Sequence, residues 1–293
     1  TISRSEIVKM KCLSKHHSAR SAVKKLFTQP QKKLLRAATK HYTMPTPFFD
    51  YLLRLGDNAL ILGQRLSEWC GHGPVLEQDI AITNIALDQI GQARTLLEYA
   101  GKVEGKGRSE DDLAYLRDVP EFRNILLVEQ PNEDWAYTIA RQFFFDVFNF
   151  YLYEGLMESG DDHLAAIARK AHKEITYHLR YSSEWMIRLG DGTEVSHAKI
   201  QEAVEDLWRF TGELTLADDL DNQMADHGLS PNLAEVKVRW DEKVDAILRE
   251  ATLSKPQNSW MQQGGKKGIH TEHLGYILAE MQYLPRAYPG AEW

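Results

Sequence analysis

Apolar and polar positions repeat every three or four residues along most of the chain, which is the period of an amphipathic α-helix. No stretch alternates with the two-residue period of a half-buried strand. Four long helical segments come first, and three more follow. The predicted ranges are 46–69, 79–101, 132–159, 163–189, 194–214, 230–247 and 270–284. The pattern predicts an all-α protein, a four-helix bundle with additional C-terminal helices.

Capping residues set the ends of several segments. Ser109–Asp112 has the spacing of a capping box and predicts a short helix in the connector between the second and third segments. Asn132–Asp134 offers a cap to the third segment. Ser230 and Pro231 are the residue types that occupy the N-cap and the first helical position, so they predict the start of a later helix.

The third segment is apolar nearly all round, unlike the others. Its run of phenylalanines consists of Phe143, Phe144, Phe145, Phe148 and Phe150. A helix that is apolar on every side is buried on every side. We therefore predict that this helix is central and that its phenylalanines pack the core, with the lining of a substrate tunnel as the alternative.

The second segment carries two polar residues on its core face. Gln89 and Gln92 continue the stripe of Ile82, Ile85 and Leu96. In a helical bundle an acidic-x-x-His pair at this spacing is half of a carboxylate-bridged di-metal site. Both positions are amides here, so we interpret them as a buried hydrogen-bonded pair without catalytic chemistry.

Charge divides the chain into two parts. Residues 1–43 hold eleven Lys or Arg and one acid, so the remainder holds 24 Lys or Arg and 41 acids, a net charge of −17. Because residues 44–293 are so acidic, they cannot bind nucleic acid through the release of counterions. We interpret residues 1–43 as a tag or upstream sequence, although their composition also suggests a transit peptide, and residues 44–293 as the helical domain.

Cysteine use and hydropathy indicate the compartment. Cys12 and Cys70 are too few for a disulfide framework and lack metal-ligand spacing, which favours the reducing cytoplasm. Polar or charged residues interrupt every apolar run, so no segment is predicted to cross a membrane. Seven histidines also lack ligand spacing, and most of them are predicted to be surface or capping residues: His72, His163, His172, His197, His227, His270 and His273.

Long, specific motifs occur in three places, at Asp50–Pro74, Ser183–Thr193 and His270–Leu284. Together they resemble the C subunits of the ring-1,2-phenylacetyl-CoA epoxidases, which are bacterial multicomponent monooxygenases. The resemblance covers nearly everything after Met44. It implies a ferritin-like fold, and it implies that a sister subunit holds the di-iron site and binds phenylacetyl-CoA, whereas this chain has no working metal centre.

The resemblance also implies a vestigial di-iron pocket, whose positions are Glu68, Gln89, Gln92, Asp146, Ile175 and His178. The first helix keeps its carboxylate, while amides replace the Glu and the His of the second. The third-helix position is Asp146, with Asn149 as the alternative. In the fourth helix an isoleucine replaces the Glu and the His is kept. No catalytic, cofactor-binding or metal-binding residues are expected in this chain.

Electrostatics favour the same interpretation. Two iron ions need several carboxylates, and amides are poor iron ligands. A neutral glutamine avoids the repulsion between buried carboxylates that lack a cation. We predict a closed hydrogen-bond network in the pocket, formed by Glu68, Gln89, Gln92, Asp146 and His178, with or without one water. A different helix phase offers an alternative ligand set for a working di-iron centre, namely Glu68, Asp88, Asp146, Glu174 and His178.

The resemblance implies a structural, non-catalytic subunit of the phenylacetyl-CoA 1,2-epoxidase complex in aerobic phenylacetate degradation. The expected partners are the catalytic di-iron subunit, in an obligate hetero-oligomer, and other subunits of the complex. No cofactor is expected in this chain, because NADPH, flavin and iron–sulfur chemistry belong to a separate reductase. The alternatives are a self-sufficient di-iron oxygenase or oxidase, and a scaffold that binds the acyl-CoA.

Overall fold

The computed structural model describes residues 47–257 and 260–291, and the predicted leader at residues 1–43 lies outside them. In this described part the regular structure is entirely helical, with ten α-helices, three short 3-10 helices and no strand. The prediction of an all-α protein is confirmed. None of the described helices is both long and apolar enough to cross a membrane.

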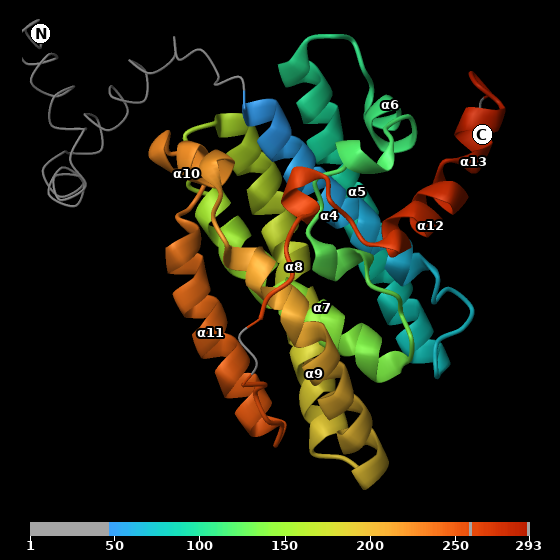
Figure 1. Ribbon diagram of the computed structural model, residues 1–293, viewed down its shortest axis with the longest axis vertical. Helices are drawn as coiled ribbons and strands as arrows, with labels where there is room; N and C mark the ends of the chain where they lie inside the picture. Colours follow the sequence, from blue (N-terminus) through green and yellow to red (C-terminus); the bar gives the residue numbers. More distant parts are fainter. Residues whose placement is uncertain (1–46, 258–259, 292–293) are drawn as a thin grey trace, which may run out of the picture. The chain divides into compact units, whose positions relative to one another are not determined.

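Four long helices form the bundle, namely α4 (Phe48–Ser67), α5 (Leu76–Glu104), α7 (Trp135–Leu156) and α8 (Asp162–Gly190). Helix α4 packs along α5, and α7 packs along α8 (Figure 1). Helices α5 and α8 meet much less extensively, so the contact between them depends on a few side chains. The predicted four-helix bundle is therefore present, with its two helix pairs joined loosely along one side.

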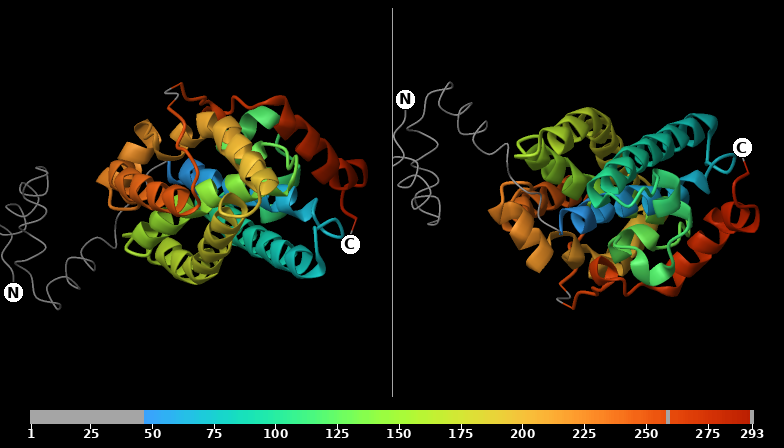
Figure 2. Two further views of the ribbon diagram at one scale, coloured as in Figure 1. Left: turned by 90° about the horizontal axis from the view of Figure 1, so that it is seen from below. Right: turned by 90° about the horizontal axis from the view of Figure 1, so that it is seen from above.

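The remaining described elements complete the fold (Figure 2). They are α6 (Glu110–Tyr115), η1 (Val119–Glu121), η2 (Leu126–Glu129), α9 (Glu194–Thr215), α10 (Asp219–Asp226), α11 (Leu233–Glu250), η3 (Gly265–Lys267), α12 (Glu272–Met281) and α13 (Tyr283–Ala287). Helices α9 and α11 pack on α7, and α12 packs on α4. The capping box predicted for α6 is present. The Ser109 hydroxyl accepts a hydrogen bond from the backbone N–H of Asp112, and the Asp112 carboxylate accepts one from the backbone N–H of Ser109.

Three boundaries differ from the sequence prediction. Helix α10 was not predicted, because its eight residues bury only Asp221 and Met224 and show too little periodicity. Helix α11 begins after Asn232 rather than at Ser230, since the Asn232 side chain caps the amide of Ala234 at 2.8 Å. The last predicted helix is two helices, α12 and α13, which meet at Gln282.

Helix α7 lies in the core, as its composition predicts. Phe143, Phe144 and Phe145 are at most 1% exposed. The indole of Trp240 on α11 donates to the carbonyl of Phe144 at 3.0 Å, and Trp208 stacks edge-on against the Phe144 ring. The phenylalanines therefore pack the core, and the tunnel alternative gains no support from their surroundings.

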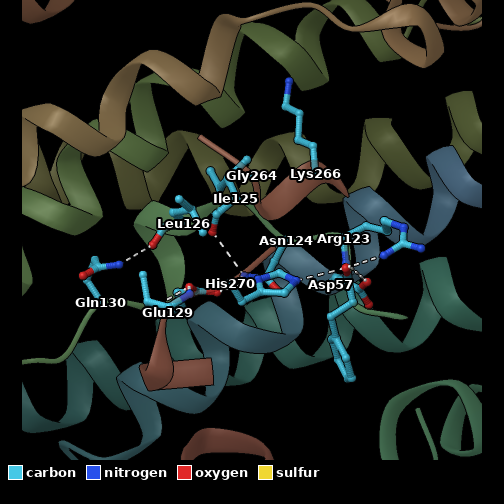
Figure 3. Close-up of polar contacts among 12 residues, drawn as sticks. Asp57, Arg123, Asn124, Ile125, Leu126, Glu129, Gln130, Gly264, Lys266 and His270 are labelled. Atoms are coloured by element: carbon cyan, nitrogen blue, oxygen red, sulfur yellow. Dashed lines mark hydrogen bonds and ion pairs between the residues drawn. The ribbon is translucent and has the colours of Figure 1, made fainter. Parts of the chain in front are cut away.

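The polar face of α4 is buried as well, which the sequence pattern did not predict. Asp57 is fully buried, and its carboxylate accepts hydrogen bonds from the guanidinium of Arg117 and from the amide of Arg123. Figure 3 shows Asp57 beside Arg123 and Asn124 of the connector. At the next position along the chain, Asn58 accepts from the amide of Ile125 at 2.8 Å. The connector between α6 and α7 thus covers α4 and satisfies its polar side chains.

Two buried glutamates attach the C-terminal segment to this connector (Figure 3). Glu129 accepts from Asn124 at 2.9 Å and from the amide of Thr271 at 2.7 Å, and His270 Nδ1 lies 2.9 Å from its carboxylate. Glu213 of α9 accepts from three backbone amides, those of Leu126, Gly264 and Lys266. We refer to these groups as the connector network, made of Asp57, Asn58, Arg117, Asn124, Glu129, Glu213 and His270.

His270 corrects one prediction. Its side chain is completely buried, and its second ring nitrogen lies 3.1 Å from the carbonyl of Phe122. A lone histidine in a polar loop gives no local sign of burial, because its partners come from a segment about 140 residues earlier in the chain.

Candidate functional site

The pocket positions on three of the bundle helices come together in the middle of the bundle. Gln89 on α5, Asp146 on α7, and Ile175 and His178 on α8 are fully buried, and Gln92 is 4% exposed. The helical phase that was read from the sequence places all five correctly, because the apolar stripes of these helices face the same core.

Asp146 is held within the α7–α8 pair. Its two carboxylate oxygens accept from Gln142 at 2.7 Å and from Ser182 at 2.8 Å. Burial raises the pKa of Asp146 to about 7, and the nearby His178 only partly opposes this shift. The carboxyl group therefore keeps its proton over much of the acidic range, where an exposed aspartate is ionised.

Two hydrogen bonds cross between α5 and α8 beside the pocket. His178 Nε2 lies 3.0 Å from the carboxylate of Asp88, and Gln92 donates to Glu174 at 2.9 Å. Asp88 and Gln92 are one turn apart on α5, as Glu174 and His178 are on α8. We refer to these four side chains as the α5–α8 bracket.

A cleft of about 220 Å³ opens next to the bracket. Its walls include Leu87, Asp88 and Gly91 of α5, and Lys170 and Glu174 of α8. Beside it, α5 and α8 pack together less extensively than α4 with α5 or α7 with α8. Asp88 is 37% exposed there, so the bracket connects solvent with the buried ring of His178.

Glu68 lies away from the other pocket residues. It is the C-cap residue of α4, its side chain is 38% exposed, and it accepts from Arg65 and from Asn132, each at 2.8 Å. At the level of Gln89, α4 presents Gly63 instead, where an added Cβ would lie 3.4 Å from the Cβ of Gln89. The first helix thus contributes close-packed backbone to the pocket rather than a carboxylate.

The predicted closed hydrogen-bond network is wrong. Among the described residues neither amide atom of Gln89 has a hydrogen-bond partner, and the same holds for Gln92 Oε1 and His178 Nδ1. The reason is geometric: Gln92 and His178 bond outward to the bracket carboxylates, Asp146 bonds within α7 and α8, and Glu68 lies beyond reach. Gln89 is left pointing into the core alone.

The donor set does not fit a di-iron centre. Such a centre takes four carboxylates and two histidines from four helices, whereas this pocket offers Asp146 and His178. The alternative set is also dispersed, because Glu68 lies elsewhere and Glu174 is bonded to Gln92. Across residues 47–257 and 260–291, no three His, Cys, Asp or Glu side chains come close enough to hold a metal ion.

The sequence signal for the partners of Asp146 was present but not used. Gln142 lies one turn before Asp146 on α7, and Ser182 lies one turn after His178 on α8, both on the predicted inward stripes. At these spacings the amide of Gln142 on α7 and the hydroxyl of Ser182 on α8 can both donate hydrogen bonds to Asp146. That arrangement indicates a structural carboxyl group.

Comparison with known proteins agrees with this architecture. Residues 34–293 match the family described as phenylacetic acid catabolic protein, and the chain belongs to that family, with its ferritin-like, all-α fold. A curated relative is the C subunit of the 1,2-phenylacetyl-CoA epoxidase of Escherichia coli (strain K12). It is 54% identical to this chain over 243 residues, which are 83% of this chain and 98% of the relative. The resemblance stated from the sequence is therefore confirmed, and the chain is a protein of phenylacetate catabolism.

Proposed function

We propose that this chain is a structural, non-catalytic subunit of a phenylacetyl-CoA epoxidase complex, in which it pairs with a catalytic di-iron subunit. The observation that carries this proposal is the pocket, where two amides and an isoleucine stand at positions that would otherwise supply ligands. The relative in Escherichia coli supports the assembly, because it is named as a subunit of such an epoxidase.

The pocket chemistry is consistent with a bundle that is stable without a metal. Gln89 and Gln92 are neutral, and the pKa of Asp146 is raised to about 7, so its carboxyl group retains its proton below that pH. A buried site with so little charge needs no cation to balance it. The di-iron centre would then reside in the partner subunit, and NADPH, flavin and iron–sulfur chemistry in a reductase.

The alternatives gain little from the structure. A self-sufficient oxygenase needs a ligand cage that the described side chains do not form. The cleft beside the bracket, of about 220 Å³, is smaller than the roughly 300–1,000 Å³ typical of ligand pockets. A larger cleft of about 540 Å³ lies between η1 and α12, so the acyl-CoA scaffold is decided by a binding measurement. Titration of the isolated chain with phenylacetyl-CoA tests the scaffold, and we expect no saturable binding.

The decisive experiment measures metal and turnover together. We expect the purified chain to contain far less than one iron per molecule, and we expect the complex reconstituted with Gln89→Ala to keep its epoxidase activity in proportion to the amount of complex formed. The matched control is Gln223→Ala, which removes an exposed glutamine side chain on α10. Stoichiometric iron held by His178, or loss of turnover in an intact Gln89→Ala complex, would show that this subunit takes part in the chemistry.

A further inference from the structure

The outer side of α5 carries three aliphatic side chains in one stripe. Leu76, Ile80 and Leu87 are 71%, 52% and 61% exposed. Their spacings of four and seven residues place them on a single helical face about 16 Å long. We refer to these three residues as the outer stripe of α5.

Helix α5 is therefore apolar on two opposite sides. Its inner side buries Ile82, Ile85 and Leu96 completely within the bundle. A helix that is apolar on both sides is normally buried on both sides, and a contiguous exposed apolar stripe marks an interaction site. Among the described residues the bundle covers only the inner side, which leaves the outer stripe open to a partner.

The charges around the stripe restrict what that partner is. From Gly71 to Ala93 the sequence contains no Lys or Arg, and its charged residues are Glu77, Asp79 and Asp88. Exposed apolar residues combined with the absence of lysine are typical of the core of a protein interface.

The cleft at the end of the stripe has the same sign of charge. Leu87 belongs both to the stripe and to the cleft wall, where Asp88 and Glu174 face a single lysine, Lys170. Two copies of this face would bring carboxylates against carboxylates, which disfavours self-association. The complementary surface is apolar with basic side chains at its edge.

We propose that the outer stripe of α5 and the adjoining cleft form the docking surface for the di-iron subunit of the oxygenase complex, which presents there apolar side chains flanked by Lys or Arg. The proposal rests on the proposed function, because it requires that the chain works inside a complex. The partner covers Leu76, Ile80 and Leu87, and a basic side chain enters the cleft to pair with Asp88 or Glu174.

The test uses a charged double variant, Ile80→Lys with Leu87→Lys, and the co-expressed di-iron oxygenase subunit as the probe. The matched control is Val195→Lys with Val238→Lys, since these valines are 68% and 58% exposed on other helices. We expect the stripe variant to bind at least ~100-fold more weakly than the wild type, and the control to bind normally. Both variants should melt at the wild-type temperature, because all four sites are exposed.

A second variant tests the sign of the charge. Ile80→Glu with Leu87→Glu removes the same apolar contacts, but it should lose less affinity than the lysine variant at low salt, and the difference should shrink as salt is added. Equal losses for the two signs at low salt would overturn the basic character of the partner.

Other outcomes overturn the surface itself. Normal binding by the lysine variant, with a wild-type complex present, rejects the docking surface and leaves the proposed function intact. If the wild type forms no complex at all, the proposed function fails and this proposal fails with it. A concentration-dependent dimer of the isolated chain that the lysine variant abolishes would assign the stripe to a second copy instead.

Discussion

The connector network and the bundle pocket are both buried and polar, yet their hydrogen bonds are completed to very different degrees. Glu129 accepts from side chains and backbone of the connector and the C-terminal segment, and Glu213 accepts from three backbone amides. In the pocket, Gln89 has no side-chain partner among the described residues, and His178 has one. The connector network links separate segments of the chain by hydrogen bonds. In the pocket, Gln89 forms no hydrogen bond to another described side chain.

This difference teaches where buried polarity stabilises the fold. A buried acceptor surrounded by donors contributes to stability, and removing it leaves each donor unpaired at a cost of about 1–3 kcal/mol. An amide that is already unpaired carries such a cost in the native protein. The same kind of substitution should therefore have opposite effects in the two regions.

The largest effect is expected from Glu129→Ala. The change leaves His270, Asn124 and the amide of Thr271 without their acceptor, so we expect a loss of about 3–5 kcal/mol in the free energy of unfolding. Urea denaturation measures it. The matched control is Glu280→Ala on the exposed side of α12, which should change stability by less than about 0.5 kcal/mol. Equal, small effects of the two variants would erase the contrast between the regions.

Glu213→Gln is a subtler change in the same network. One carboxylate oxygen accepts from Leu126 and the other from Gly264 and Lys266, so an amide NH₂ must face at least one backbone N–H. We expect a loss of about 2–3 kcal/mol despite the identical shape. A stability within error of the wild type would mean that these amides find other acceptors, and hydrogen exchange at Leu126 and Gly264 would show it.

Asp146→Asn should affect the pocket in a pH-dependent way. Because the pKa of Asp146 is raised to about 7, the folded chain keeps a proton that the unfolded chain loses near pH 4, so this group makes the wild type less stable as pH rises from about 4 to 7. The variant lacks this slope. We expect it to be about 1–2 kcal/mol more stable than the wild type at pH 8, with the difference vanishing towards pH 4.

Thermal unfolding at several pH values measures this difference. A constant difference between Asp146→Asn and the wild type across the whole range would contradict the assignment of the slope to Asp146.

Gln89→Leu should have the smallest effect and the opposite sign from the network variants. It replaces an unpaired amide by an apolar side chain of similar volume, so we expect it to be neutral or to stabilise by up to about 1 kcal/mol. Gln92→Leu is the companion variant, and it should destabilise slightly because Glu174 loses a donor. A large loss in Gln89→Leu would reveal that its amide makes hydrogen bonds after all.

The sequence predicted the long helices and the inward faces of α5, α7 and α8, because helical periodicity is a local property. It misplaced Glu68 for a reason that is also local. The predicted helix extends to Trp69, but α4 ends at Ser67, and Glu68 is its C-cap residue. It lies more than one turn beyond Gly63, the α4 residue that faces Gln89. The sequence also left open whether Gln89 or Asp88 faces the pocket, because these two neighbouring residues of α5 are both polar.

The connector network was beyond local reasoning. Asp57 and Asn58 look like the solvent face of an amphipathic helix, and nothing nearby in the sequence indicates that residues 117–125 cover them. Likewise, Glu129 acquires its partners from residues 270 and 271. Such burial depends on tertiary contacts between distant segments, which no propensity or period encodes.

The position of those last partners has a consequence for synthesis of the protein. His270 and Thr271 are translated after all four bundle helices, so Glu129 remains without these two partners until the segment that follows α11 has been made. A chain interrupted in the Gly264–Gly268 loop would therefore carry all four bundle helices and a buried carboxylate without these two partners.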